Sequence, residues 1–173
     1  MAAYRDADSI STVAAIGGGV IGNGWVAALL GSGRAVRLYD PMPGAGERTR
    51  IHVSGAWDQM VELGLAKADD EWSARFSVHD TVADALAGSD FVQESRPEGT
   101  FRKRVLFPGL ARRPPADVLV ASSTSSLPIT DLQAGLATAH RFVLGHPFNP
   151  VHLIPLVEVG GGVGFTRSAH GRC

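Results

Sequence analysis

The chain has 173 residues, of which 45% are apolar and 19% are charged, a composition that suits one globular domain of about 100–200 residues. Its 16 basic and 17 acidic residues leave a formal charge of −1, so no basic surface is expected for a nucleic acid or an anionic membrane. Cys173 is the single cysteine, which excludes an intramolecular disulfide and a cysteine-based zinc site, and we expect no metal. The apolar stretches are too short for a membrane span, and the N-terminus is unlike a signal peptide. We therefore predict a cytoplasmic protein.

Short runs rich in strand-forming residues alternate with longer segments of helical character, a pattern typical of βαβ units around a parallel sheet. We therefore predict an α/β fold with a doubly wound, mostly parallel sheet. Helices are predicted at Val20–Leu30, Pro43–Leu65 and Thr81–Ala87. The seven predicted strands are Thr12–Ile16, Ala35–Tyr39, Arg75–Val78, Asp90–Gln93, Asp117–Ala121, Arg141–Leu144 and Leu156–Val159.

The last residues of the chain differ in composition from the rest. Residues 1–159 are expected to form one domain, because predicted elements fill them. Residues 160–173 begin with a Gly-rich run, show no hydrophobic periodicity and have little to bury. We expect this tail to be disordered or aberrant.

A glycine-rich turn follows the first predicted strand directly. Residues 17–22 read G-G-G-V-I-G, which fits the pattern G-x-G-x-x-G of Rossmann-type dinucleotide-binding domains. Gly17 allows the tight turn, Gly19 lets the backbone approach a pyrophosphate, and Gly22 lets the helix pack on the strand. The predicted helix starts at Val20, and its first residues, Val20 and Ile21, would offer free N–H groups to the phosphates. A glycine loop without a ligand is the alternative, and the order of strand, turn and helix disfavours it.

An acidic residue ends the second predicted strand. Asp40 stands where the carboxylate that binds the adenosine ribose hydroxyls belongs. Its negative charge would repel a 2′-phosphate, so the sequence predicts NAD as the cofactor in preference to NADP.

A histidine follows the predicted strand Arg141–Leu144. Ligands of a doubly wound sheet bind outside the carboxyl ends of its strands, which places His146 in the cofactor cleft. A histidine can take and return a proton near neutral pH, and the nearby Glu158 could fix its tautomer. The serines of residues 122–126 follow another strand. From the residues alone, a His146 that merely packs and serines that merely cap a helix remain equally open.

Four segments together resemble the L-3-hydroxyacyl-CoA dehydrogenase family, whose branches include carnitine and L-gulonate dehydrogenases, and the carnitine branch looks nearest. The similarity covers about residues 10–159, and the steps of 21 residues from Ser125 to His146 and 12 from His146 to Glu158 fit the family. The segments are the glycine turn, Gln93–Glu98, Ser122–Leu127, and Gly145–Pro150 with Leu156–Val159.

The resemblance implies an NAD-dependent oxidation of a 3-hydroxy substrate to the 3-keto product. It implies that His146 is the general base, with Glu158 as its carboxylate partner. Ser125 would hydrogen-bond the substrate oxygen and the nicotinamide side, with Asn149 nearby. The last implied contacts, to the nicotinamide-ribose half of NAD, come from Glu98 and Lys103.

The chain also departs from the family pattern. Family members carry a second, all-helical domain that makes them homodimers, and no such domain follows here, so we hypothesise a truncated or frameshifted gene product. Pro108 lies in the helix expected after Arg102, where a proline costs about 3 kcal/mol. We therefore expect that helix to end early, or this segment to fit the family poorly.

The substrate is open between acyl-CoA, carnitine and polyol acids. Ile51–Leu65 contains no lysine or arginine to hold the phosphates of coenzyme A, which favours a small hydroxy acid such as carnitine. An aromatic cage for its quaternary ammonium could use Trp25, Trp57 and Trp72, although packing is the commoner role of such residues.

Two alternatives remain for the function. One is an NAD-binding fragment without turnover, and the other is a flavin-binding domain, which shares the glycine pattern. The flavin alternative explains neither His146 nor its spacing from Ser125 and Glu158.

Overall fold

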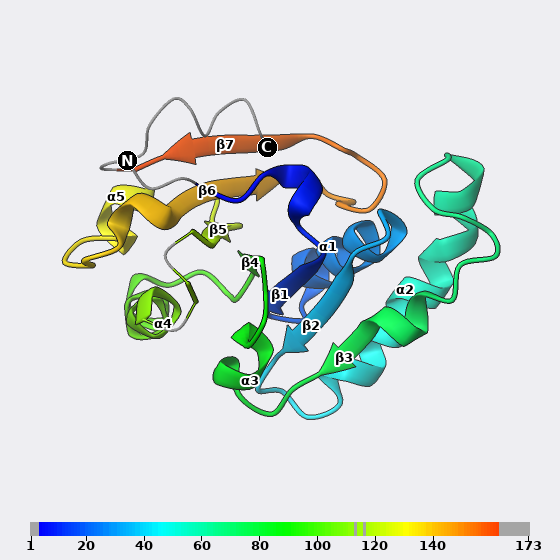
Figure 1. Ribbon diagram of the computed structural model, residues 1–173, viewed down its shortest axis with the longest axis horizontal. Helices are drawn as coiled ribbons and strands as arrows, with labels where there is room; N and C mark the ends of the chain where they lie inside the picture. The colour runs from blue at the N-terminus through cyan, green and yellow to red at the C-terminus, as the bar shows by residue number, and fades with distance from the viewer. Residues whose placement is uncertain (1–3, 113, 116, 163–173) are drawn as a thin grey trace.

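The computed structural model describes residues 4–112, 114, 115 and 117–162. It is an α/β domain built on one seven-stranded sheet, with helices on both faces (Figure 1). The strands are β1 (Thr12–Ile16), β2 (Ala35–Tyr39), β3 (Phe76–Val78), β4 (Phe91–Glu94), β5 (Leu119–Ser122), β6 (Phe142–Pro147) and β7 (Val157–Gly161). The α-helices are α1 (Val20–Gly31), α2 (Ala45–Glu62), α3 (Val82–Leu86), α4 (Thr100–Arg112) and α5 (Ile129–Leu132), and short 3-10 turns lie at Ala7–Ser9, Trp72–Arg75 and Ala139–Arg141.

The strand order is β3-β2-β1-β4-β5-β6-β7, and every neighbouring pair is parallel except β6 with β7. The predicted doubly wound, mostly parallel sheet is thus confirmed. The chain leaves β1 toward β2 on one side and later returns to β4 on the other. A switch point of this kind opens a crevice at the carboxyl ends of β1 and β4.

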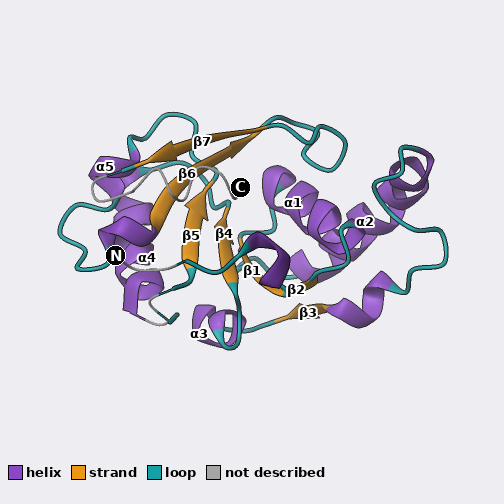
Figure 2. Ribbon diagram, turned by 45° about the horizontal axis from the view of Figure 1, so that its top comes forward, coloured by secondary structure: helices purple, strands orange, loops and turns teal. Residues whose placement is uncertain are grey.

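Alternation along β1 separates the core into two layers. Ala14 and Ile16 face the cluster that includes Phe107 of α4, while Ala15 faces the cluster that includes Val26 of α1 and Met60 of α2. Figure 2 shows α1 and α2 on one side of the sheet and α4 and α5 on the other. The helices beside the crevice are therefore held in place by packing against the two faces of the sheet.

Helix α4 continues through its proline. We expected either an early end of this helix or a poor fit of the segment to the family, and the early end is wrong, because α4 runs through Pro108 to Arg112. Phe107 and Leu110 flank the proline and are both fully buried in the core. Burial of two large apolar side chains stabilises a domain by about 1.5–3 kcal/mol each, which offsets the cost of a proline inside the turn.

The sheet also extends beyond the predicted domain boundary at residue 159. Gly160 and Gly161 belong to β7, where they pair with Leu144 and Val143 of β6. The remainder of the predicted disordered tail, residues 163–173, lies outside the described residues. Among the described helices, none combines the length and the apolar character needed to cross a membrane.

Two histidines meet where the connection between β6 and β7 packs against α2. The rings of His52 and His152 lie edge to face, with centroids 5.1 Å apart. His52 Nε2 and His152 Nδ1 are buried without a hydrogen-bond partner. Burial lowers the pKa of both rings from 6.5, and the charge of His52 lowers the pKa of His152 further. Burial therefore favours the neutral form of both rings.

This contact predicts a loss of stability in mild acid. As the pH is lowered below 6.5, the unfolded chain binds protons at His52 and His152 before the folded chain does. The free energy of unfolding should therefore decrease as the pH decreases. Urea denaturation between pH 8 and pH 5.5 measures this dependence. The double variant His52→Gln/His152→Gln should show a shallower slope, with His79, whose pKa burial also lowers, contributing to the remainder. An unchanged slope in the double variant would contradict the prediction.

Candidate active site

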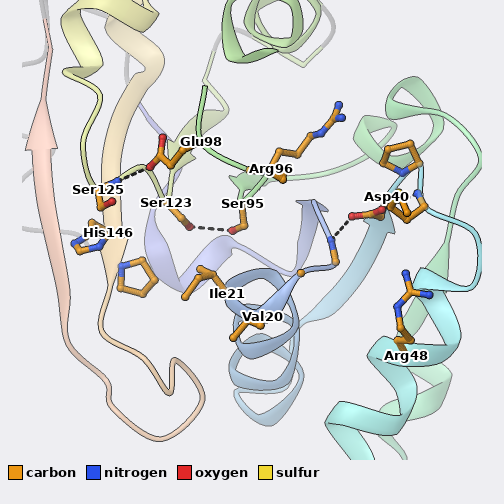
Figure 3. Close-up of a pocket in the computed structure, with 16 residues that line it drawn as sticks. Val20, Ile21, Asp40, Arg48, Ser95, Arg96, Glu98, Ser123, Ser125 and His146 are labelled. Carbon is orange, nitrogen blue, oxygen red and sulfur yellow. Dashed lines mark hydrogen bonds between the residues drawn. The ribbon is translucent and has the colours of Figure 1, made fainter. Parts of the chain in front are cut away.

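A cleft of about 690 Å³ opens at the carboxyl ends of the strands (Figure 3). Its walls come from the glycine turn after β1, from Asp40 after β2, and from the segments after β4 and β5. His146 and Pro147 of β6 complete it. Pockets of about 300–1,000 Å³ are typical of small-molecule and cofactor sites.

The glycine turn forms one end of the cleft. Gly17 has a φ of +113°, a conformation that side chains disfavour, and a Cβ at this position would lie 2.8 Å from the carbonyl oxygen of Ser95. At Gly22 a Cβ would lie 1.9 Å from the carbonyl oxygen of Gly17. Nothing lies within 4 Å of the corresponding position at Gly19, the N-cap of α1. The backbone at the start of α1 therefore faces open space, as phosphate binding requires.

Asp40 lies beside this turn. Its Oδ2 accepts a hydrogen bond from the Gly18 N–H at 2.7 Å, and its Oδ1 accepts one from the Met42 N–H at 2.8 Å. Arg48 of α2 lines the same part of the cleft and donates to the Pro43 carbonyl at 2.8 Å. This end of the cleft therefore holds both a carboxylate and a guanidinium.

A histidine and a glutamate meet at the other end. The antiparallel register of β6 and β7 sets His146 directly opposite Glu158, and Nδ1 of His146 lies 3.0 Å from Oε2 of Glu158. His146 lines the cleft, and its side chain is 30% exposed. With Nδ1 turned to the carboxylate, Nε2 is the ring nitrogen available to a ligand.

Glu98 joins the segments after β4 and β5. Its carboxylate accepts hydrogen bonds from the Ser125 N–H at 2.8 Å and from the Thr124 hydroxyl at 3.0 Å. Glu98 and Ser125 both line the cleft (Figure 3). Asn149, by contrast, is exposed and is not among the residues that line it.

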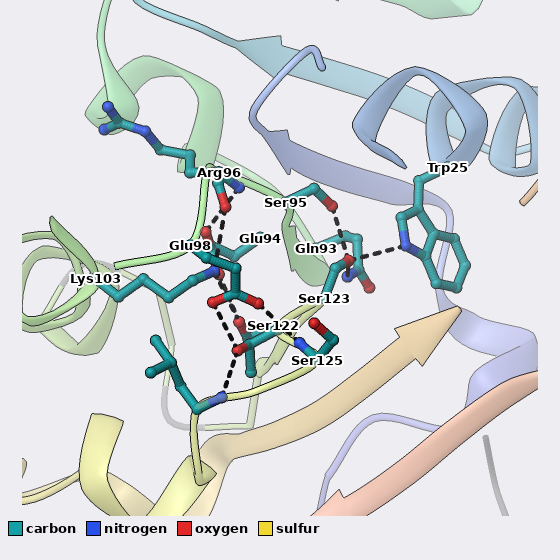
Figure 4. A network of polar contacts seen from close by, with 12 residues as sticks. Trp25, Gln93, Glu94, Ser95, Arg96, Glu98, Lys103, Ser122, Ser123 and Ser125 are labelled. Atoms are coloured by element: carbon teal, nitrogen blue, oxygen red, sulfur yellow. Dashed lines mark hydrogen bonds and ion pairs between the residues drawn. The ribbon is translucent and has the colours of Figure 1, made fainter. Parts of the chain in front are cut away.

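Lys103 occupies a different place from the one the resemblance implied. Its side chain is 1% exposed, and Nζ donates to Oε2 of the fully buried Glu94 at 2.7 Å (Figure 4). The same oxygen accepts from the Ser122 hydroxyl at 2.6 Å, and the other carboxylate oxygen accepts from the Arg96 N–H at 2.8 Å. Lys103 thus fixes the segment after β4 from behind and is not among the residues that line the cleft.

Two of the three tryptophans serve packing. The rings of Trp57 and Trp72 lie 5.9 Å apart within the core cluster under α2. Trp25 instead reaches the cleft wall, where its indole N–H donates to the Ser123 hydroxyl at 3.1 Å. The three side chains therefore form no common aromatic cage.

Comparison with known proteins decides the family. The profile of the family "3-hydroxyacyl-CoA dehydrogenase, NAD binding domain" matches residues 12–166. The chain belongs to this family. The L-carnitine dehydrogenase of Streptomyces coelicolor is 47% identical over 155 residues, a stretch that covers 90% of this chain and 48% of that protein. The family match reaches past the predicted domain boundary at residue 159.

Solved structures of related dehydrogenases share the fold of this chain. The 3-hydroxybutyryl-CoA dehydrogenase of Escherichia coli superposes with a TM-score of 0.84 at 30% identity, over 92% of this chain and 34% of that one. An NAD⁺-dependent dismutase, the 5-dehydrogenase of a formyl-hydroxy-methylpyridine carboxylic acid, gives 0.83 at 34% identity, over 94% and 52%. The chain spans about half the length of the curated relatives that it matches.

The cleft of this NAD-binding domain fits its cofactor. The open backbone at Gly19 and the start of α1 suit the pyrophosphate, and Asp40 suits the hydroxyls of the adenosine ribose. His146 and Ser125 lie at the opposite end, where the nicotinamide half would reach. Within the described part of the chain, no three His, Cys, Asp or Glu side chains converge on a point where a metal could bind.

Some cleft residues carried no assigned role in the sequence. Ser95, Arg96 and Ser123 line the cleft because they directly follow β4 and β5, and position after a parallel strand was the signal that could have found them. Arg48 lies eight residues after Asp40 and belongs to no obvious motif, and only the direction of α2 brings it to the cleft.

The charges at the adenosine end predict a change of cofactor preference. Wild type should bind NADH more tightly than NADPH, and Asp40→Asn should narrow that difference by about tenfold or more, since it removes the repulsion of a 2′-phosphate and leaves Arg48 nearby. Asparagine keeps one oxygen to accept from the Gly18 N–H and loses only the bond from the Met42 N–H. Fluorescence titration with both nucleotides measures this. An unaltered NADH/NADPH ratio would show that Asp40 does not select the cofactor.

The buried ion pair predicts a large and asymmetric effect on stability. Lys103→Met leaves the carboxylate of Glu94 buried without its counter-charge and should lower the free energy of unfolding by about 3–5 kcal/mol. The double variant Glu94→Gln/Lys103→Met removes both charges and should recover much of that loss. Urea denaturation of the three proteins gives the comparison. Equal stability of wild type and Lys103→Met would contradict a structural role for the pair.

Proposed function

We propose that this domain serves an NAD-dependent dehydrogenase that oxidises the 3-hydroxy group of a small acyl or hydroxy-acid substrate to the 3-keto group. The observation that carries the proposal is the contact between His146 and Glu158 at the mouth of the NAD cleft. A histidine held by a carboxylate on one nitrogen and open to a cleft on the other is the arrangement of a general base.

In this mechanism, Nε2 of His146 takes the proton of the substrate hydroxyl. Nδ1–H donates to Glu158 throughout, which fixes the tautomer and stabilises the imidazolium that forms. When bound, NAD supplies the acceptor for the hydride of the carbinol carbon. The protein contributes position and charge.

Ser125 positions the reacting oxygen. Glu98 anchors its backbone N–H and the neighbouring Thr124 hydroxyl, so that the Ser125 side chain is presented from a fixed segment. The hydroxyl of Ser125 would donate to the substrate oxygen, at the nicotinamide end of the cleft. Asn149, which the resemblance places nearby, does not line the cleft and is given no step here.

A small hydroxy acid of the carnitine type is the favoured substrate. Relatives named L-carnitine dehydrogenase share 41–47% identity with this chain. Residues 51–62 of α2 also carry no lysine or arginine that could hold the phosphates of coenzyme A. L-3-Hydroxyacyl-CoA remains the alternative within the same reaction type.

The test is NADH formation at 340 nm with L-carnitine, D-carnitine and (S)-3-hydroxybutyryl-CoA as substrates. We expect turnover with L-carnitine and little with its enantiomer. His146→Gln should reduce kcat by about 10²–10⁴-fold, the usual contribution of a general base, and leave the Kd for NADH within about twofold. Glu158→Gln should give a smaller loss.

Two results would contradict the proposal. One is a His146→Gln variant that retains wild-type kcat. The other is wild-type protein that binds NADH tightly and oxidises none of the three compounds, which would favour an NAD-binding domain without turnover.

A further inference from the structure

One serine in the cleft wall is the centre of a three-way hydrogen-bond junction. The Ser123 hydroxyl oxygen lies 3.1 Å from the Trp25 indole nitrogen, 2.8 Å from Nε2 of Gln93 and 2.9 Å from the Ser95 hydroxyl (Figure 4). Ser123 and Ser95 both line the NAD cleft. Gln93 is buried, so its side chain has a fixed place beneath the junction.

The chemistry of the partners sets the direction of the third bond. An indole N–H can only donate, and the Gln93 amide nitrogen also donates. Together they occupy both lone pairs of the Ser123 oxygen. The only remaining role for the Ser123 hydroxyl is to donate its own hydrogen to Ser95.

The Ser95 hydroxyl therefore remains available as a hydrogen-bond donor. Its oxygen already accepts from Ser123, so its own O–H is free to donate elsewhere, and the side of Ser95 open to ligands is the cleft. Its Cβ lies 3.6 Å from the position a Cβ would take at Gly22, and its carbonyl lies against Gly17. Ser95 is therefore placed between the glycine turn and the Ser125–His146 end (Figure 3).

We propose that Trp25 and Gln93, acting through Ser123, orient the Ser95 hydroxyl as a hydrogen-bond donor to the diphosphate–ribose bridge of the bound dinucleotide. Ser95 is the contact, and Trp25 is a positioning residue that never touches the ligand. The proposal rests on the NAD site described above and is independent of which substrate is oxidised.

The contact is tested by binding of ligand fragments to the 173-residue chain. Ser95→Ala should weaken NADH and ADP-ribose by a similar factor of about three to ten, the value of one lost hydrogen bond, and leave AMP unchanged. Calorimetry or fluorescence gives the three dissociation constants, and wild-type affinity for NADH tests the site itself. Loss of NADH affinity alone would move the contact to the nicotinamide and overturn the proposal, as would equal weakening of AMP or no effect at all.

The positioning role is tested by a double-mutant cycle. Trp25→Phe removes the indole N–H, frees a lone pair on Ser123 and lets Ser95 donate backwards, so NADH and ADP-ribose should bind about two- to fivefold more weakly. In the Ser95→Ala background the same substitution should have no further effect. The matched control is Trp57→Phe, which removes a tryptophan whose N–H donates to the Lys67 carbonyl in the core and should leave binding unchanged.

Additive effects of Trp25→Phe and Ser95→Ala would overturn the orienting role, because they would show that Trp25 acts by another route. If Trp25→Phe does not fold, the cycle can be run with Ser123→Ala, which breaks the junction without removing an aromatic ring. Loss of orientation in that variant should again be coupled to Ser95, and independence of the two would refute the proposal.

Discussion

The arrangement of the cleft depends on one buried ion pair. Glu94 and Lys103 are almost completely excluded from solvent, where an unpaired charge is too costly to keep. Glu94 ends β4, and its two oxygens also hold Ser122 at the end of β5 and the backbone of Arg96. Glu94 thus links the start of the segment after β4 to β5, through Ser122, and to α4, through Lys103. Because Ser95 and Glu98 lie in that segment, the middle of the cleft is positioned by two buried charges that do not line it.

The last strand provides the second constraint. The connection between β6 and β7, residues 148–156, is shorter than the dozen or more residues that a parallel crossover needs, so β7 must return antiparallel. In that register His146 and Glu158 become direct cross-strand partners on one face. The step of 12 residues between them in the sequence is therefore a consequence of hairpin geometry, and the pair is held by the backbone of two strands.

Local pattern accounts for most of what the sequence predicts correctly. The strands, the glycine turn and the acid after β2 depend on neighbours in the chain, and the helices α1, α2 and α3 are found within three residues of their predicted bounds. Tertiary environment decides the rest. Whether Lys103 faces a ligand or Glu94 depends on how α4 is rotated against the sheet, and Pro108 is tolerated because core burial outweighs a local preference.

In this cleft, polar groups that can either donate or accept a hydrogen bond are paired with groups that can do only one of the two. A serine hydroxyl can donate or accept, but Ser123 is met by the indole of Trp25, which only donates. An imidazole can carry its proton on either nitrogen, but His146 is met by Glu158, a carboxylate that accepts when ionised. Each pairing leaves one predictable function facing the cleft. Polar groups set in this way need little reorganisation when a ligand arrives, which is the condition for selective binding.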